Sequence, residues 1–163
     1  MCGRYILING QKIFASWETM KQLDKKGIKY SVIEPNYNIA PSTFNPIVIG
    51  TNGLKTLQYA KWGFNWEMLD RATGELKKIL TINAKDEKVT KSNLFSKSFR
   101  ERRCLIPTDG FYEWKQLDSK NKQPYLIKMK DNSTFMFAGL FRVEKDEQKK
   151  EMLTYTIDLP PKR

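Results

Sequence analysis

The chain has 163 residues, a length typical of one domain, and 29 Lys and Arg residues against 18 Asp and Glu give a net charge of +11. A hydrophobic content of 40% and a mean hydropathy of -0.60 exclude a membrane-spanning run, and the N-terminus lacks the features of a secretory signal. Two cysteines and no histidine argue against a disulfide framework, a zinc site and a Cys-His pair. We expect a cytoplasmic monomer without metal or cofactor, with no membrane partner.

The excess of positive charge favours a polyanionic partner such as a nucleic acid, because cationic side chains neutralise phosphates and release counterions. A lysine-rich surface that only keeps the protein in solution would give the same charge. Charge alone therefore leaves both interpretations open.

Residues 11–26 predict the first element, an amphipathic helix. Its apolar residues recur at steps of three and four, which favours packing on a core over a binding role. Two apolar runs follow, at residues 46–50 and 54–62. They flank an Asn-Gly turn at residues 52–53, and this pattern predicts a β-hairpin.

The polar stretch at residues 65–78 predicts a surface loop with a helical turn, and residues 79–84 predict a strand. Apolar residues at helical spacing predict a short basic helix at residues 91–103. Further strands are expected at residues 104–107, 110–117, 124–129, 134–143 and 152–157. The class is therefore α+β: a single domain whose mostly antiparallel strands form a barrel-like or bent sheet with flanking helices.

Cys2 directly follows the initiator methionine, and a residue this small allows that methionine to be removed. The new N-terminus would carry an amine and a thiol on neighbouring carbons. Amine attack on an aldehyde gives an imine, and the thiol can close on the imine carbon to form a five-membered thiazolidine. The alternative is an inert cysteine. Cys104 lies in an apolar run, so we expect it to be buried and structural.

Seven segments follow one another along the chain: MCGRY at the start, YNIAPS at 37–42, KWGF at 61–64, INAKDE at 82–87, RRCLIPTDGFYEWK at 102–115, PYLIK at 124–128 and FAGLF at 137–141. In order and spacing they resemble the SOS response-associated peptidase (SRAP) family of abasic-site processing proteins, up to about Ile157. The resemblance implies that Cys2, after loss of Met1, forms a thiazolidine with the opened sugar of an abasic site. The product would be a covalent crosslink to single-stranded DNA.

The resemblance also implies catalytic roles for Asn83 and Glu113. The Asn83 amide can orient the α-amine or the sugar hydroxyls. Glu113 lies between Tyr112 and Trp114, and a carboxyl group partly buried among aromatic rings suits proton transfer. Without the resemblance, Asn83 would be interpreted as a turn residue and Glu113 as an outward-facing strand residue.

Candidate DNA-contacting residues include phosphate ligands, led by Arg4 and a cluster of arginines before the GFYEW segment. Two aromatic residues of KWGF are candidates to stack on a base or wedge the strand open, with core packing as the alternative. Asn38 and Pro41 match the family's NxxP element. The full set is Arg4, Asn38, Pro41, Trp62, Phe64, Lys85, Arg100, Arg102, Arg103 and Trp114.

The chain departs from the family pattern at two places. Lys85 replaces an arginine, which keeps the charge and loses bidentate phosphate geometry. The chain ends DLPPKR and has no histidine, whereas family members continue to a histidine associated with acid-base work at the sugar. We therefore expect a single domain over residues 1–163 that is shortened at its C-terminus, and the missing histidine argues against strand-cleaving lyase activity.

Two other functions stay open at this point. One is a non-covalent module that binds single-stranded nucleic acid. The other is a cysteine peptidase whose proteolysis is limited to removal of its own Met1. A covalent adduct that survives denaturation would separate the crosslinking function from both.

Overall fold

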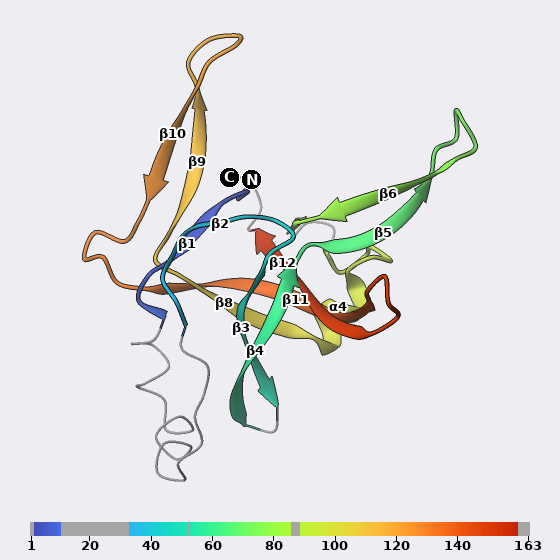
Figure 1. Cartoon of the computed structure of the whole chain (residues 1–163), viewed down its shortest axis with the longest axis horizontal. Helices are drawn as coiled ribbons and strands as arrows, with labels where there is room; N and C mark the ends of the chain where they lie inside the picture. Colours follow the sequence, from blue (N-terminus) through green and yellow to red (C-terminus); the bar gives the residue numbers. More distant parts are fainter. Residues whose placement is uncertain (1, 11–32, 52, 86–88, 160–163) are drawn as a thin grey trace.

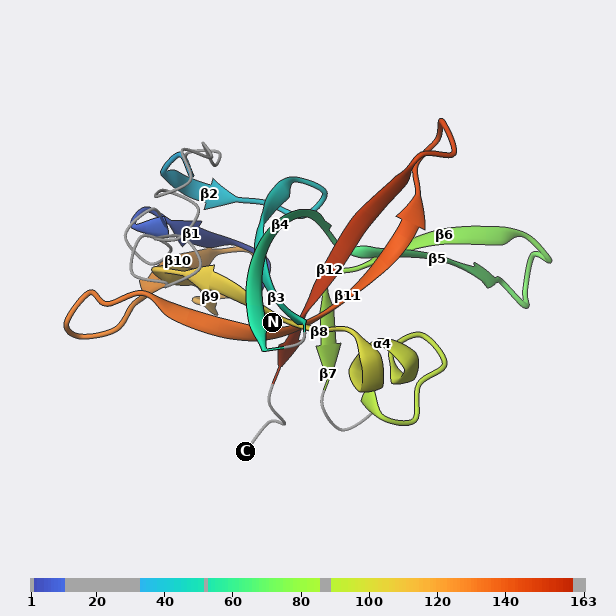
Figure 2. The same ribbon diagram turned by 90° about the horizontal axis from the view of Figure 1, so that it is seen from below.

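The computed structural model describes residues 2–10, 33–51, 53–85 and 89–159, and it is mainly β. The strands, labelled in Figure 1 and Figure 2, are in chain order β1 (Tyr5–Leu7), β2 (Asn36–Ile39), β3 (Phe44–Thr51), β4 (Leu54–Trp62), β5 (Phe64–Leu69), β6 (Leu76–Thr81), β7 (Asn83–Lys85), β8 (Arg103–Thr108), β9 (Gly110–Gln116), β10 (Lys122–Ile127), β11 (Phe135–Lys145) and β12 (Glu151–Leu159). A short helix, α4 (Ser96–Glu101), lies between β7 and β8 in the chain.

Strands β3, β4, β12, β11 and β8 close into a barrel, because β12 pairs with both β4 and β11. The β12–β4 pair is parallel and the other pairs in the ring are antiparallel. Large side chains fill the interior, among them Trp62, Tyr155 and Ile106, all with 0% exposure. A Cβ at Gly139 would lie only 2.3 Å from Ile106 Cδ1, so the barrel closes tightly at this position.

A four-stranded sheet in the order β10-β9-β1-β2 packs on the barrel and carries the N-terminal strand. Figure 2 shows this sheet on one side of the barrel and the β5–β6 hairpin on the other. Tyr5 of β1 joins sheet to barrel: its ring meets Trp62 at a centroid distance of 5.2 Å, and its hydroxyl lies 2.7 Å from that of Tyr155. The buried strand β1 is therefore fixed to the barrel core.

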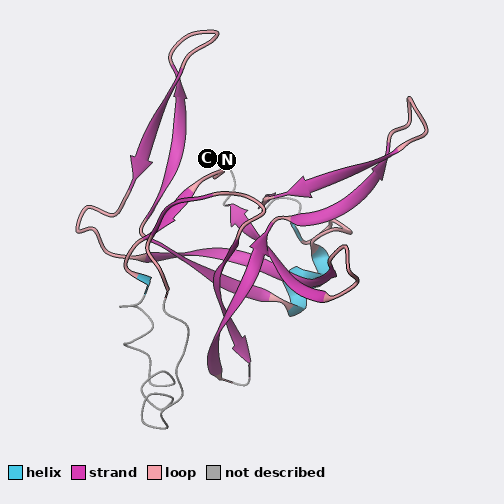
Figure 3. Ribbon diagram, viewed as in Figure 1, coloured by secondary structure: helices cyan, strands magenta, loops and turns pink. Residues whose placement is uncertain are grey.

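Two hairpins project from the body of the molecule, β9–β10 and β5–β6, as Figure 3 shows. The β5–β6 hairpin begins at Gly63, whose φ of +115° is a conformation that L side chains rarely adopt. A Cβ there would also lie 2.4 Å from Leu80 Cδ1. Glycine at this position thus lets the chain turn out of the barrel.

The predicted class needs correction, because the chain is mainly β rather than α+β and the flanking helices are not supported. The helix expected at residues 11–26 lies outside the described residues. The helix expected at residues 91–103 is much shorter and spans Ser96–Glu101. No helix within the described ranges is long and apolar enough to cross a membrane.

The strand predictions are more accurate. The β3–β4 hairpin is confirmed, and so are the strands expected from residue 104 onward, within a few residues at their ends. The loop expected at residues 65–78 is wrong, since most of it forms β5 and β6. The strand expected at residues 79–84 is divided at Ile82, whose carbonyl accepts hydrogen bonds from Trp62 Nε1 and Ile157 N. This break begins a separate strand at Asn83.

Candidate active site around Cys2

Cys2 precedes β1 and is buried against the barrel, with 2% of its surface exposed. Its core cluster includes Tyr5, Trp62 and Tyr155. The thiol lies 3.7 Å from the carbonyl oxygen of Arg4, to which it can donate a weak hydrogen bond. The sulfur is therefore held in place beside polar backbone while most of its surroundings are apolar.

Asn83 lies next to Cys2, although 81 residues separate the two in the chain. Its Nδ2 atom donates a hydrogen bond of 2.8 Å to the Cys2 carbonyl oxygen. Strand β7 positions the side chain, because Asn83 pairs with Ile157 of β12 in parallel register. The buried Asn83 Oδ1 atom has no hydrogen-bond partner among the described residues, which leaves an acceptor beside the N-terminal segment.

Burial is the main reason why the pKa of the Cys2 thiol is raised to about 12; a backbone hydrogen bond of Arg4 acts to lower this pKa, and the charge of the Glu113 carboxylate acts to raise it. Glu113 lies on β9 opposite Tyr125 of β10. Neighbouring residues on a strand point to opposite faces, so Tyr112 and Trp114 lie on the other face of β9. Glu113 is itself partly buried, whereas the rings of its two chain neighbours project from the opposite face of the strand.

Arg4 lies on the face of the sheet opposite to that of Glu113. Its Nη1 atom donates a 2.8 Å hydrogen bond to Asn38 Oδ1 on β2, and its backbone carbonyl accepts from Tyr112 N. The Tyr112 hydroxyl in turn donates to the carbonyl of Tyr37, beside Asn38. An arginine held in this way presents its remaining donors in a fixed direction.

Two of the predicted DNA-contacting residues are instead core residues. Trp62 and Phe64 have 0% exposure, so neither ring presents a face to a base. Trp62 stacks on Tyr155, and the Arg142 guanidinium lies 4.4 Å from the centre of the Phe64 ring. Trp114, by contrast, is 43% exposed.

The remaining candidates differ in their surroundings. Pro41 is partly buried, and Lys85 is exposed two residues after Asn83. Arg100 is in the last turn of α4, and Arg103 pairs with Leu140 at the start of β8. The arginine cluster therefore lies on elements other than those that carry Cys2, Asn83 and Glu113.

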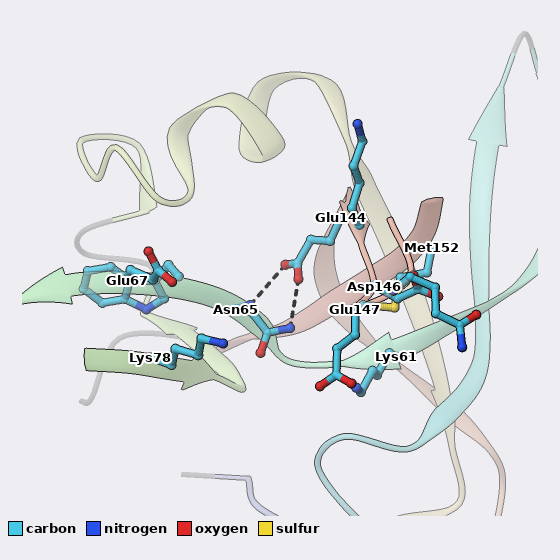
Figure 4. Close-up of a pocket in the computed structure, with 11 residues that line it drawn as sticks. Lys61, Asn65, Glu67, Lys78, Glu144, Asp146, Glu147 and Met152 are labelled. Carbon is cyan, nitrogen blue, oxygen red and sulfur yellow. Dashed lines mark hydrogen bonds between the residues drawn. The ribbon is translucent and has the colours of Figure 1, made fainter. Parts of the chain in front are cut away.

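A hollow of about 870 Å³ lies away from Cys2. It lies between the base of the β5–β6 hairpin and the β11–β12 turn, as Figure 4 shows. Glu144 accepts hydrogen bonds from the backbone and side-chain nitrogens of Asn65 there, at 3.1 and 2.9 Å, and from Arg142 Nε at 2.7 Å. Glu144 therefore anchors the hairpin. No His, Cys, Asp and Glu cluster suited to a metal ion occurs within the described residues.

Two groups that hold strand β1 in place were not predicted from the sequence. Asp109 accepts hydrogen bonds from the backbone nitrogens of Ile8 and Asn9 and from the Thr134 hydroxyl, which ties the end of β1 to the β8–β9 turn. The Tyr5–Tyr155 hydroxyl pair fixes the middle of β1. The TDG segment was a signal for Asp109, because aspartate before glycine is typical of tight turns.

The fold and these contacts define a single-domain, mainly β barrel protein whose candidate nucleophile precedes a strand packed on the barrel. The family described as SOS response associated peptidase (SRAP) matches residues 1–158, and the chain belongs to this family.

Three relatives illustrate the similarity. The abasic site processing protein YoaM of Bacillus subtilis is 35% identical over 159 residues, which cover 96% of this chain and 66% of YoaM. YoqW of the same organism is 33% identical, with 96% and 67% covered. The crystal structure of a phage-related protein from Bordetella bronchiseptica superposes with a TM-score of 0.67 at 25% identity, covering 98% of this chain and 69% of the phage-related protein. The chain thus spans about two thirds of the length of these relatives.

Proposed function

We propose that this protein processes abasic sites by forming a covalent crosslink between Cys2 and the opened sugar of an abasic site in single-stranded DNA. The observation that carries the proposal is the hydrogen bond that Asn83 donates to the Cys2 carbonyl across 81 residues of sequence, together with the charge of Glu113 acting on the Cys2 thiol. Relatives named abasic site processing proteins support it. The activity, the monomeric state and the preference for single strands are proposals.

The thiol's pKa of about 12 sets the order of the steps, because a buried thiol of this kind is protonated near neutral pH. Hydrolysis first removes Met1 and exposes the α-amine of Cys2. The amine, with an ordinary pKa of about 7.7 to 8.0, is then the first nucleophile. It adds to the sugar aldehyde carbon, and loss of one water gives an imine.

The thiol then adds to the imine carbon. A carbon–sulfur bond forms, the C=N double bond becomes a single bond, and the thiol proton ends on the ring nitrogen. The overall reaction releases one water and needs neither an oxidant nor a reductant. Amine and thiol are on one residue, so ring closure is intramolecular and favoured by proximity.

Glu113 is proposed to move protons in both stages. Its carboxyl group protonates the hydroxyl that leaves as water, and the resulting carboxylate takes the proton of the poorly acidic thiol. The charge of Glu113 acts on the Cys2 thiol through space, and this supports the proposed role. Asn83 holds the Cys2 carbonyl and offers Oδ1 as an acceptor to the α-amine or a sugar hydroxyl.

The DNA backbone is proposed to run past Arg4, held by Asn38, with Lys85 as a second cation and Trp114 as an exposed ring for an unpaired base. Pro41 would shape the wall of this path. Trp62 and Phe64 have no part in it because they are buried.

The test incubates the protein with three oligonucleotides: abasic single-stranded, intact single-stranded and abasic duplex. A denaturing gel separates covalent from non-covalent complexes, and a salt titration of binding to the intact strand measures the electrostatic contribution. We expect a denaturation-resistant adduct only with abasic DNA, more with the single strand, and binding that weakens steeply with salt. Binding to the abasic strand that disappears completely on denaturation would show a non-covalent module instead.

A further inference from the structure

A second hollow, about 550 Å³ in volume, lies at one end of the barrel, away from the contacts of Cys2. It is formed where β3 ends, β4 and β8 begin and β12 ends, beside the middle of β11 and near α4. This volume is within the range of sites that hold small molecules or short peptide segments, about 300 to 1,000 Å³.

The walls of the hollow are largely apolar, and part of this apolar lining is exposed. Leu105 is 44% exposed, and it lies beside Ala138 of β11, which is also exposed. Met136, Leu140 and Phe99 complete the apolar lining. The Cys104 thiol also lines it and stays uncharged, since burial raises its pKa to about 12. Exposed apolar surface gathered in a concave site marks a place where a ligand or partner binds.

Cations stand at the edge of this apolar hollow. Lys55 and Arg103 line the hollow and are exposed. Arg100 lies nearby in the last turn of helix α4. Asp158 is the one carboxylate among the lining residues that are described, and it is partly buried. The exposed part of the edge therefore carries positive charge.

We propose that this hollow is a docking site for an acidic peptide of a partner protein, which inserts an apolar side chain between Leu105 and Ala138 and places its carboxylates near Lys55 and Arg103. The site differs from the Cys2 surroundings in its residues and in its chemistry, and the proposal does not depend on the crosslinking function. Single-stranded DNA fits less well, because Phe99 is the only aromatic ring among the described lining residues and it is partly buried. In this proposal the arginines near α4 face an acidic peptide and not DNA.

The probe is a fluorescein-labelled peptide of four aspartates followed by leucine and phenylalanine, and fluorescence anisotropy measures its binding to the full chain. Two control peptides replace either the leucine and phenylalanine with alanines or the aspartates with asparagines. Three variants complete the design: Ala138→Trp fills the hollow, Lys55→Glu reverses an edge charge, and Lys78→Glu makes the same charge change on the distant β6.

We expect saturable binding of the probe that weakens at least about tenfold with Ala138→Trp and about fivefold with Lys55→Glu, since surface charge pairs contribute up to about 1 kcal/mol. Lys78→Glu should bind as the wild type, and both control peptides should bind at least about fivefold more weakly than the probe. Circular dichroism checks that each variant is folded. Binding that survives loss of the apolar residues, or that Lys78→Glu weakens as much as Lys55→Glu, would mean attraction to a basic surface and would overturn the proposal. Binding unchanged by Ala138→Trp, or full competition by an intact single-stranded oligonucleotide at equal concentration, would overturn it as well.

Discussion

The two cysteines are buried to a similar extent but differ in their polar neighbours. Cys2 and Cys104 are both buried, with exposures of 2% and 5%, and burial raises the pKa of each thiol to about 12. Around Cys104 burial is the only cause of the shift. Around Cys2, a backbone hydrogen bond of Arg4 and the Glu113 carboxylate also act on the thiol, and Asn83 donates a hydrogen bond to the Cys2 carbonyl.

This comparison teaches that acid strength does not distinguish a candidate nucleophile from a structural cysteine in this protein. The polar neighbours do, together with a position next to the N-terminus, where an amine can form beside the thiol. Burial of Cys104 confirms the sequence prediction that it is a core residue. The following predictions test the difference, from the largest expected effect to the smallest.

Cys2→Ser should lose the stable adduct with abasic single-stranded DNA, by at least about a thousandfold, because a hydroxyl replaces the ring-closing thiol. Its amine should still form an imine that borohydride captures. Denaturing gels with and without borohydride measure both products. An extra residue placed before Cys2 leaves the thiol intact and blocks the amine, so this matched variant should lose both products.

Glu113→Gln should slow adduct formation by about a hundredfold, the usual size of a lost proton-transfer group. Non-covalent affinity for intact single-stranded DNA should stay within about twofold, since no proposed phosphate contact is removed. Time courses on denaturing gels and anisotropy titrations measure the two effects. If rate and affinity fell together, Glu113 would be acting on DNA binding or on folding.

Asn83→Ala should slow adduct formation by about tenfold, because an unsatisfied buried carbonyl and a misplaced main chain cost about 1 to 3 kcal/mol. Asn83→Asp is the control, since it keeps the size of the side chain and removes the Nδ2 donor that contacts the Cys2 carbonyl. Both variants should be slow. An aspartate variant as fast as the wild type would show that shape matters at this position and donation does not.

Cys104→Ala should leave the rate of adduct formation within about twofold of wild type while it lowers the free energy of unfolding by about 1 to 2 kcal/mol, as expected for a small cavity. Urea unfolding and the gel assay measure the two quantities. Loss of crosslinking by a variant that is still folded would place Cys104 in the chemistry and remove the distinction between the two cysteines.

Alkaline pH should lower the free energy of unfolding of the wild type more than that of Cys104→Ala. The folded state raises the pKa of the Cys104 thiol from 9.0 to about 12. The folded state therefore keeps this proton longer than the unfolded state does, and the resulting stability is present below pH 9 and is lost as pH rises toward 12. Between about pH 9 and 11 the wild type should lose up to about 1 kcal/mol per pH unit more than Cys104→Ala. Urea unfolding at these pH values measures the free energy of unfolding of both proteins. If wild type and Cys104→Ala lost stability equally as the pH rose, Cys104 would not be a buried, protonated thiol.

Local sequence patterns predicted those elements whose signals are local. The β3–β4 hairpin has apolar runs on both sides of an Asn-Gly turn, and the strands after residue 103 have alternating or β-branched residues. The β5–β6 hairpin has most of its side chains exposed on both faces, so it lacks the alternation that marks a half-buried strand. It was therefore interpreted as a loop.

The candidate site depends on contacts that no local pattern contains. Cys2 and Asn83 meet because β7 pairs in parallel with β12, near the end of the chain. Trp62 and Phe64 were interpreted as stacking residues because the local sequence does not show whether an aromatic ring is buried or exposed. The closed barrel shows that both are buried. Family resemblance pointed to Asn83 and Glu113, whose roles stay predictions.

The mass of the covalent complex tests the central claim most directly. Intact-mass spectrometry of the protein, purified and reacted with an abasic single-stranded oligonucleotide, gives the stoichiometry, and peptide mapping gives the residue. The account predicts the mass of the chain without Met1 plus the oligonucleotide minus one water, with the attachment at Cys2. A complex that retains Met1, or one attached at Cys104 or at a lysine, would contradict it.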